Sequence, residues 1–478
     1  MKKVELENHK KIKKFGKVYT VCYNGMNVHL TEVEAHAISG IPSFNIVGLG
    51  DKAISESRDR VRSALFINNY QLPIGRLIIN LSPAAIQKEG THYDLPIALS
   101  ILNLLGIVNN LNEFIFIGEL TLSGDILPAR GIISFAIFAL KNNKIIVCCE
   151  NNYEELRLLP GVHCLFANNI RELILLLNNP KPLITSSINI EKKQLTTPII
   201  YGQEFAVYAL TIAAIGRHHM LFVGAPGVGK TTLIHTLPYI LPNLNENEKL
   251  EVSEIYSRAG ILSNELIHRP PLRQPHSSAS LVSIIGGCDP GEISFAHHGI
   301  LFLDEAPEFG SKILDALRTP LEEQVVYVAR AKYRITYPAN IQLIMAMNPC
   351  KCGLRLEKRC NCNKRSVISG PILDRIDITI HLKKDQSKTI TELPSIDRIK
   401  QARIKQEERG IENSRLTLNH LMNLIDNNLI MMVHNTQSLR EKLKILRLAL
   451  TISEFHNDLK VTKEHIYEAM TFKGLNME

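Results

Sequence analysis

The spacing of apolar residues divides the chain into three stretches. Up to about residue 175, short runs rich in β-branched and aromatic residues alternate with runs of helical period, which is typical of α/β structure. Residues 200–382 show the same alternation, and from about residue 395 the pattern is almost wholly helical. We therefore predict an α/β fold class with a helical C-terminal region. The strands expected in the first stretch are Val28–Glu34, Phe44–Val47, Leu77–Leu81, Phe114–Ile117 and Lys144–Cys148.

A helix is predicted over Asp51–Ile67, because Ile54, Val61 and Leu65 fall on one face of it. Its arginines point elsewhere: Arg58, Arg60 and Arg62.

A chain of 478 residues is too long for a single core. We expect a loose, charged extension over residues 1–16 and a first domain over 17–177. A polar, proline-containing linker over 178–199 follows. A second α/β domain is expected over 200–384 and a helical region over 385–478.

Composition changes this picture only slightly. A hydrophobic content of 45% and a charged content of 21% are ordinary for a globular protein. The net charge of +8 permits an anionic partner such as nucleic acid, but a solvated basic surface explains it equally well.

The chain shows no pattern typical of secretion or of a membrane span. The lysine-rich segment 1–14 is followed by no apolar run of the kind that a signal peptide needs. The longest apolar run, Leu95–Val108, is interrupted by Asn103 and is too short to span a bilayer. Four of the nine cysteines crowd into residues 350–362, unlike a disulfide framework. A cytoplasmic protein that does not enter membranes is expected.

Residues 224–231 fit the phosphate-binding pattern G-x-x-x-x-G-K-[ST] completely, between an apolar run and a helical pattern. The glycines let backbone N–H groups close around phosphate oxygens. We expect Lys230 to reach the β- and γ-phosphates of ATP and the Thr231 hydroxyl to hold Mg²⁺. The predicted nucleotide-binding residues are Gly224, Ala225, Pro226, Gly227, Val228, Gly229, Lys230, Thr231 and Thr232.

Two further apolar strands end in polar residues suited to hydrolysis. The run 299–305 ends in Asp304 and Glu305. We expect this strand to lie beside the strand of the phosphate loop, so that Asp304 joins the Mg²⁺ shell and Glu305 orients and deprotonates water. A third strand, Ile341–Met347, ends at Asn348, whose amide is suited to contact the γ-phosphate or the water. The alternative for Asn348 is a simple strand-end turn.

Several longer segments resemble the Mg-chelatase-like AAA+ ATPases of the ComM (YifB) type. In the second half they are 269–276 (RPPLRQPH), 290–299 (PGEISFAHHG), 301–309 (LFLDEAPEF), 346–353 (AMNPCKCG) and 369–377 (SGPILDRID). In the first half they are 44–49 (FNIVGL), 56–62 (ESRDRVR) and 88–98 (KEGTHYDLPIA). The resemblance extends over about residues 17–475.

The resemblance implies a Lon-protease-like N-terminal domain, an AAA+ module and a helical lid. It also implies a hexameric ring that moves on single-stranded or branched DNA and drives branch migration in recombination, as in natural transformation. Arg375 matches the family's arginine finger, which reaches the γ-phosphate of a neighbouring subunit, and Arg440 matches the sensor-2 arginine of the lid. A surface salt bridge is the alternative for each arginine.

The chain departs from the family pattern at three places. Residues 286–291 are a few residues shorter than the family's glycine-rich loop, Leu450 stands where a second arginine is usual, and Ser277 replaces a second histidine. These departures affect details of the lid and the loop rather than the ATPase core.

The cysteine cluster combines two C-x-C pairs, and four thiolates at this spacing are able to surround one structural Zn²⁺. The usual spacing is C-x₂-C, so four reduced thiols on a loop are the alternative. The predicted ligands are Cys350, Cys352, Cys360 and Cys362.

The N-terminal domain is not expected to be a protease. His92 stands at the position of the Lon-type serine and Ile133 at that of its lysine, so neither nucleophile nor base is available. A structural or DNA-guiding collar is the predicted role. Other polar residues remain, but nothing in the sequence pairs them: Ser82, Lys88 and Ser123.

Residues 324–329 and 333–337 alternate like two strands of a hairpin with a basic tip. In related AAA+ helicases a hairpin at this place points into the ring pore, which predicts DNA contacts from Arg330, Lys332 and Arg334. The alternative is a solvated basic turn.

Three functions compete for this sequence. We favour a DNA motor over a subunit that inserts metal into a tetrapyrrole and over a peptidase or unfoldase. The Lon-like domain and the cysteine cluster oppose metal insertion, and the missing dyad opposes proteolysis.

Overall fold

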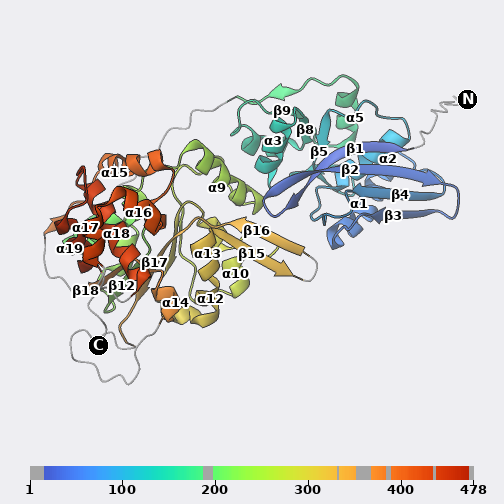
Figure 1. Cartoon of the computed structure of the whole chain (residues 1–478). Coiled ribbons are helices and arrows are strands. Elements are labelled where there is room, and N and C mark those ends of the chain that lie inside the picture. Colours follow the sequence, from blue (N-terminus) through green and yellow to red (C-terminus); the bar gives the residue numbers. More distant parts are fainter. Residues whose placement is uncertain are drawn as a thin grey trace, which may run out of the picture. The chain divides into compact units, whose positions relative to one another are not determined.

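A computed structural model of the chain describes residues 15–186, 198–330, 333–350, 368–383, 389–433 and 438–472, without the side chains of Arg330, Tyr333 and Arg334. Contacts divide these residues into two compact units (Figure 1). The first unit holds the described residues of Met1–Glu191, Ser253–Leu266 and Ala329–Ile335, and the second unit holds the others. The α/β fold class predicted from the sequence is confirmed in both units.

The first unit contains two four-stranded sheets. One sheet has the order β1-β2-β4-β3, in which only the β3–β4 pair is parallel. The other has the order β10-β9-β8-β5, in which only the β9–β10 pair is antiparallel. The strands are β1 (Gly16–Asn24), β2 (Asn27–Ile38), β3 (Ser43–Val47), β4 (Arg76–Ser82), β5 (Phe114–Phe116), β8 (Ile145–Cys148), β9 (His163–Phe166) and β10 (Leu183–Ile184), with a small pair β6 (Glu119–Leu120) and β7 (Ile126–Leu127).

Helices pack against these sheets and share an apolar core with them. Every residue of α2 is buried, so this helix forms the centre of the core. The helices are α1 (Lys52–Ile67), α2 (Asp94–Leu104), α3 (Ile132–Lys141), α4 (Tyr153–Leu156) and α5 (Ile170–Asn178).

Helix α1 confirms the predicted segment and its buried face. The Asp51 carboxylate caps the helix by accepting the Ile54 N–H at 2.9 Å. Arg60 differs from the expectation, because its Nε donates to the buried Asp94 carboxylate at 2.6 Å. Burial raises the pKa of Asp94, and the bonds from Arg60 oppose that rise. A single arginine of α1 therefore ties that helix to the start of α2.

The second unit is built around a five-stranded, fully parallel sheet of order β13-β14-β17-β12-β18. Its strands are β12 (Met220–Gly224), β13 (Leu272–Arg273), β14 (Ile300–Leu303), β17 (Gln342–Met347) and β18 (Ile378–Leu382). The expectation that the strand before Asp304 lies beside the phosphate-loop strand is wrong, because β17 pairs with both and lies between them. Local sequence patterns do not reveal strand order, because crossover connections permit more than one order.

Helices precede or connect the strands of this sheet. They are α6 (Glu204–Gly216), α7 (Lys230–Ile234), α8 (Leu237–Ile240), α9 (Glu246–Arg258), α10 (Leu281–Ile285), α11 (Glu292–Phe295), α12 (Gly310–Ala316), α13 (Arg318–Glu323) and α14 (Gly370–Leu373). Residues Ser253–Arg258 of α9 are counted with the first unit. The strands β15 (Val325–Arg330) and β16 (Tyr333–Pro338) form the predicted two-stranded hairpin. Another small pair joins β11 (Ile200–Tyr201) to β19 (Ile390–Thr391).

The C-terminal region is helical, as predicted, and shares one apolar core with the parallel sheet. The cluster joins Phe222 and Phe302 of the sheet to Leu446 and Phe455 of α18. Helix α18 packs against α6, α15 and α19. The helices are α15 (Ile396–Arg409), α16 (Leu418–Leu424), α17 (Asn427–Met432), α18 (Leu439–Phe455) and α19 (Lys463–Thr471).

Two other expectations concern the linker and membrane-spanning helices. Part of the predicted linker forms β10, whose Leu183 and Ile184 pair with β9, whereas residues 187–197 lie outside the described residues. Across the described residues, no helix is both long and apolar enough to cross a bilayer.

Candidate functional site

The phosphate loop connects the end of β12 to the start of α7, at the carboxyl edge of the parallel sheet. Gly227 and Gly229 have φ angles of 75° and 90°, which side chains of L-amino acids rarely permit. A Cβ atom built on either glycine would meet nothing within 4 Å, so the space over the loop is open. The loop therefore forms a concave backbone surface of the kind that phosphate groups occupy.

Lys230 points back over this loop and contacts three oxygen atoms. Its Nζ donates to the carbonyls of Gly224 at 2.8 Å and Ala225 at 3.0 Å, and to Asn348 Oδ1 at 2.9 Å. Burial lowers the pKa of Lys230, and the nearby Asp304 and Glu305 oppose that shift. All three hydrogen-bond acceptors of this ammonium are uncharged, so phosphate oxygens would be its first directly bonded anionic partners.

The predicted magnesium residues also meet in the structure. The Thr231 hydroxyl donates to Asp304 Oδ2 at 3.0 Å, although these residues come from α7 and the end of β14. The other Asp304 oxygen, Oδ1, accepts the Glu305 N–H at 3.0 Å. Glu305 has a φ angle of 52° and an exposed side chain, so its carboxylate is available to solvent beside the magnesium residues.

This arrangement fits Mg²⁺-ATP. A threonine hydroxyl and a carboxylate 3.0 Å apart are the oxygen ligands that Mg²⁺ takes beside phosphate oxygens. Thr231 and Asp304 would hold the ion, which would supply positive charge to offset that of the phosphates. Asn348 joins the loop through Lys230, so the ends of β12, β14 and β17 all contribute to one site.

The two arginines predicted to act in hydrolysis lie together at a different place. Arg375 and Arg440 both contact the carboxylate of Glu322, and among the described residues neither guanidinium contacts the phosphate loop of its own chain. The contacts of these arginines among the described residues are thus with Glu322, Asp374 and Pro371.

Comparison with known proteins identifies the family. Residues 197–390 match the family model described as magnesium chelatase, subunit ChlI, and residues 33–152 match that described as subunit ChlI of Mg-chelatase. The chain is 34% identical to the uncharacterized protein YifB of Escherichia coli, over 96% of this chain and 97% of that protein. The chain belongs to the Mg-chelatase-like ComM/YifB family.

Two further relatives extend the comparison. The chain is 33% identical to competence protein ComM of Haemophilus influenzae, again over 96% of this chain and 97% of the relative. It is 36% identical to the uncharacterized protein Rv2897c of Mycobacterium tuberculosis over 77% of both chains. The resemblance to this family predicted from the sequence is confirmed, and membership supports an ATPase that uses ATP and Mg²⁺.

Some predicted residues of this ComM/YifB-family chain lie outside the described part. Cys350 is buried at the end of the described segment, whereas Cys352, Cys360 and Cys362 fall within 351–367. Lys332 and the side chains of Arg330 and Arg334 are likewise outside it. The zinc site and the DNA contacts remain predictions.

His92 and Ile133, the residues at the positions of the Lon-type serine and lysine, are both buried in the structure. His92 is buried, its Nε2 lies 2.9 Å from the Val21 carbonyl oxygen, and desolvation lowers its pKa to about 4. Ile133 is a fully buried residue of α3. Lys88 is also buried and donates to the Pro83 carbonyl. A non-proteolytic role for this domain stays a prediction.

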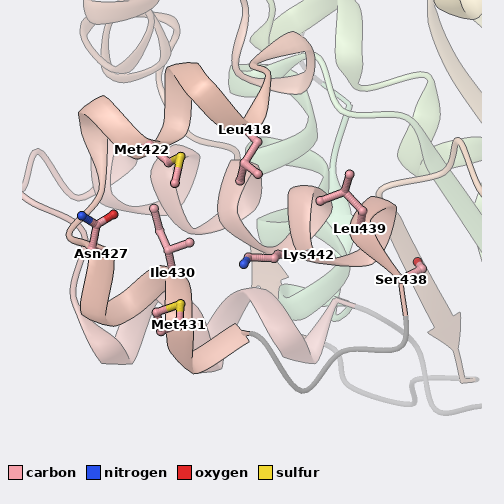
Figure 2. Close-up of a pocket in the computed structure, with 8 residues that line it drawn as sticks. All are labelled: Leu418, Met422, Asn427, Ile430, Met431, Ser438, Leu439 and Lys442. Carbon is pink, nitrogen blue, oxygen red and sulfur yellow. The ribbon is translucent and has the colours of Figure 1, made fainter.

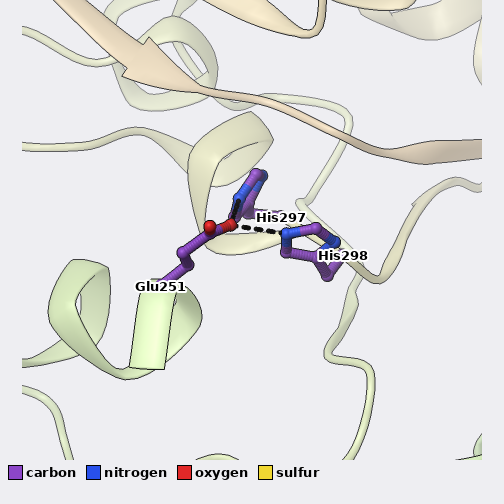
Figure 3. A group of neighbouring side chains, drawn as sticks. All are labelled: Glu251, His297 and His298. Carbon is purple, nitrogen blue, oxygen red and sulfur yellow. Dashed lines mark hydrogen bonds and ion pairs between the residues drawn. The ribbon is translucent and has the colours of Figure 1, made fainter. Parts of the chain in front are cut away.

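Sequence reasoning missed a carboxylate held by two histidines, which Figure 3 shows. Glu251 of α9 faces Nε2 of His297 at 3.2 Å and Nε2 of His298 at 2.7 Å. The ligand atoms of this trio lie within 4.8 Å of one another, a spacing that a metal ion would permit. The two histidines directly precede Gly299 and β14, at the end of the strand opposite Asp304.

The tautomer of His297 opposes metal binding at this cluster. Its Nδ1 accepts the Asn340 backbone N–H at 3.0 Å, so in the neutral ring the proton is on Nε2, facing Glu251. A metal-binding imidazole has the reverse arrangement, with the other ring nitrogen donating. Burial lowers the pKa of His297 to about 4, and bonds from His297 and His298 hold the pKa of Glu251 below its ordinary value. The cluster is a hydrogen-bonded anchor between α9 and β14.

The C-terminal helical region contains an apolar cavity of about 590 Å³, which the sequence did not indicate. Figure 2 shows its lining residues, drawn from α16, α17 and the start of α18. They are Leu418, Met422, Asn427, Ile430, Met431, Ser438, Leu439 and Lys442. With one ammonium and no phosphate-binding loop, this cavity is unlike the nucleotide site.

Proposed function

We propose that this protein is an ATP-driven AAA+ ring motor that acts on DNA and promotes branch migration during recombination or natural transformation. The proposal of ATPase activity rests on two hydrogen bonds at one edge of the sheet, one between Lys230 and Asn348 and one between Thr231 and Asp304. Lys230 and Thr231 begin α7 after the glycine loop, and Asp304 and Asn348 follow the neighbouring strands β14 and β17, which supports a site for phosphoryl transfer to water.

Each residue of this group has a separate role in the proposal. Lys230 binds the terminal phosphates, and Thr231 and Asp304 hold the magnesium ion. Glu305 accepts the proton of the attacking water, for which its exposed carboxylate stands beside Asp304. Asn348 contacts Lys230 and is placed to respond when the terminal phosphate leaves.

Similarity to a protein named competence protein ComM supports DNA as the partner. The net charge of +8 and the hairpin with a basic turn agree with a polyanionic ligand. The alternative is an ATPase subunit for metal insertion into a tetrapyrrole, which the Mg-chelatase family models favour. Near-full-length similarity to a protein named for competence, ComM, favours the DNA motor.

The proposed function is tested by the steady-state rate of ATP hydrolysis with duplex, forked and four-way DNA of equal nucleotide content. We expect forked or four-way DNA to raise the rate, together with formation of a ring-sized oligomer in ATP. Hydrolysis that no DNA changes, combined with stimulation by a tetrapyrrole-chelatase partner, would favour the alternative.

The hairpin tip is expected to grip DNA. The double change Arg330→Ala, Lys332→Ala should leave DNA-free hydrolysis intact and reduce DNA stimulation, because two phosphate contacts are lost. The slope of log affinity against log salt should become shallower by about 2. A control is Lys400→Ala, Lys463→Ala, which removes two exposed lysines of the lid helices. If DNA stimulates ATP hydrolysis equally in both double variants, the hairpin is not the DNA-binding element.

The four cysteines are expected to bind about one zinc ion per chain. Elemental mass spectrometry of protein purified without chelator measures the stoichiometry. A Cys360→Ser, Cys362→Ser variant should lose the metal, because two of the four thiolates are gone. Protein that contains far less than one zinc per chain would instead support reduced thiols.

A further inference from the structure

One carboxylate, that of Glu322, faces both of the arginines predicted to act in hydrolysis. Glu322 Oε1 accepts a hydrogen bond from Arg375 Nη2 and lies 3.7 Å from Arg440 Nη2. Arg375 Nη1 donates to the Pro371 carbonyl at 2.6 Å, and Arg440 Nη1 lies 3.5 Å from Asp374 Oδ2. Glu322 is thus the group common to the two guanidinium ions.

The three residues come from distant parts of the chain. Glu322 belongs to α13, Arg375 follows α14, and Arg440 is in the first turn of α18. Lys444, one turn further along α18, donates to the Leu373 carbonyl at 3.2 Å and so ties the lid helix to the turn that carries Arg375. The backbone brings the two arginines near each other, and the Glu322 carboxylate orients their guanidinium groups.

Burial and charge indicate what Glu322 does there. Two guanidinium ions repel each other at any physiological pH, because arginine stays protonated. The Glu322 and Arg440 side chains are 53% and 56% exposed, so their ion pair contributes little to folding stability. Arg375 is only 14% exposed, and its contacts with Glu322 and Pro371 fix its direction. We therefore expect loss of Glu322 to change the positions of the two guanidinium groups while changing the free energy of unfolding little.

We propose that Glu322 is a positioning residue that holds Arg375 and Arg440 as a pair for the phosphates in a neighbouring subunit. This inference rests on the proposed ATP-hydrolysing ring. Glu322 acts through the arginines and does not touch nucleotide. Without its carboxylate the guanidinium ions separate, and the charge that they bring to the transition state is misplaced.

The first test is the Glu322→Ala variant in steady-state ATP hydrolysis. A misplacement near 1 Å costs about 10²-fold, so we expect kcat to fall by about that factor while KM for ATP changes little. Glu323→Ala is the matched control, since Glu323 is the exposed next residue of α13 and interacts with Tyr327 instead. An unchanged kcat for Glu322→Ala, or an equal fall for Glu323→Ala, would overturn the proposal.

The second test mixes Glu322→Ala chains with Glu305→Gln chains. A Glu305→Gln chain carries an intact arginine pair, which it can offer to the intact Glu305 of a Glu322→Ala neighbour. Mixed rings should hydrolyse ATP faster than the two separate variants together. No gain despite demonstrated co-assembly, or loss of ring formation by Glu322→Ala, would overturn the proposal. Absence of hydrolysis in the wild-type chain would instead contradict the proposed function itself.

Discussion

Glu305→Gln is expected to bind ATP with near wild-type affinity and to hydrolyse it about 10²–10⁴-fold more slowly. Glutamine keeps the shape of the side chain but cannot accept the proton of the attacking water. The magnesium residues are untouched, because Asp304 holds Thr231 through Oδ2 and the Glu305 backbone through Oδ1. Binding and hydrolysis should therefore separate in this variant.

The comparison variant is Lys230→Ala, which should lose ATP affinity. Lys230 is 9% exposed and contacts three oxygens of the loop and of Asn348, so its removal eliminates a phosphate contact and leaves those oxygens without a donor. Fluorescent-nucleotide titration and single-turnover hydrolysis distinguish the two variants. Near-normal turnover by Glu305→Gln would assign the base to another residue.

Arg375→Ala should lower the rate of ATP hydrolysis by at least about 10³-fold, while each chain still binds ATP. In the structure this guanidinium contacts Glu322 and Pro371 rather than its own phosphate loop. A neighbouring subunit is therefore the proposed place where its charge stabilises the transition state. Equilibrium ATP binding and steady-state hydrolysis, measured on the same preparation, give the two quantities.

Mixing Arg375→Ala with Glu305→Gln chains tests action between subunits. Some interfaces of the mixed ring would join a wild-type Arg375 to a wild-type Glu305, so activity should exceed that of either variant alone. If proven mixed rings recover nothing, Arg375 acts within its own chain or not at all.

The sequence predicted the elements of the nucleotide site because each one is local. The glycine spacing of residues 224–231 sets a loop, and the apolar runs before Asp304 and Asn348 set buried strands. The order of those strands depends on crossover connections, which no local pattern records. Hence β17 was not expected between β12 and β14, nor Asn348 in direct contact with Lys230.

Polar contacts between residues far apart in the chain were the other features that the sequence did not predict. Arg60 lies on the polar side of α1 by its spacing, yet it bonds to the buried Asp94, because tertiary packing places α2 beside it. His297 and His298 belong to a recognisable motif, but their partner Glu251 lies in a helix whose pattern shows no special feature. Glu322 is an ordinary surface glutamate in the sequence and gains its significance only beside Arg375 and Arg440.

The central claim, a motor that couples ATP hydrolysis to DNA movement, is tested most directly by branch migration of a labelled four-way junction. We predict that the wild-type chain with ATP and Mg²⁺ converts the junction into forked products. The Glu305→Gln chain, which still binds ATP, should leave it intact. A wild-type chain that hydrolyses ATP in the presence of the junction yet yields no more product than Glu305→Gln would contradict the claim.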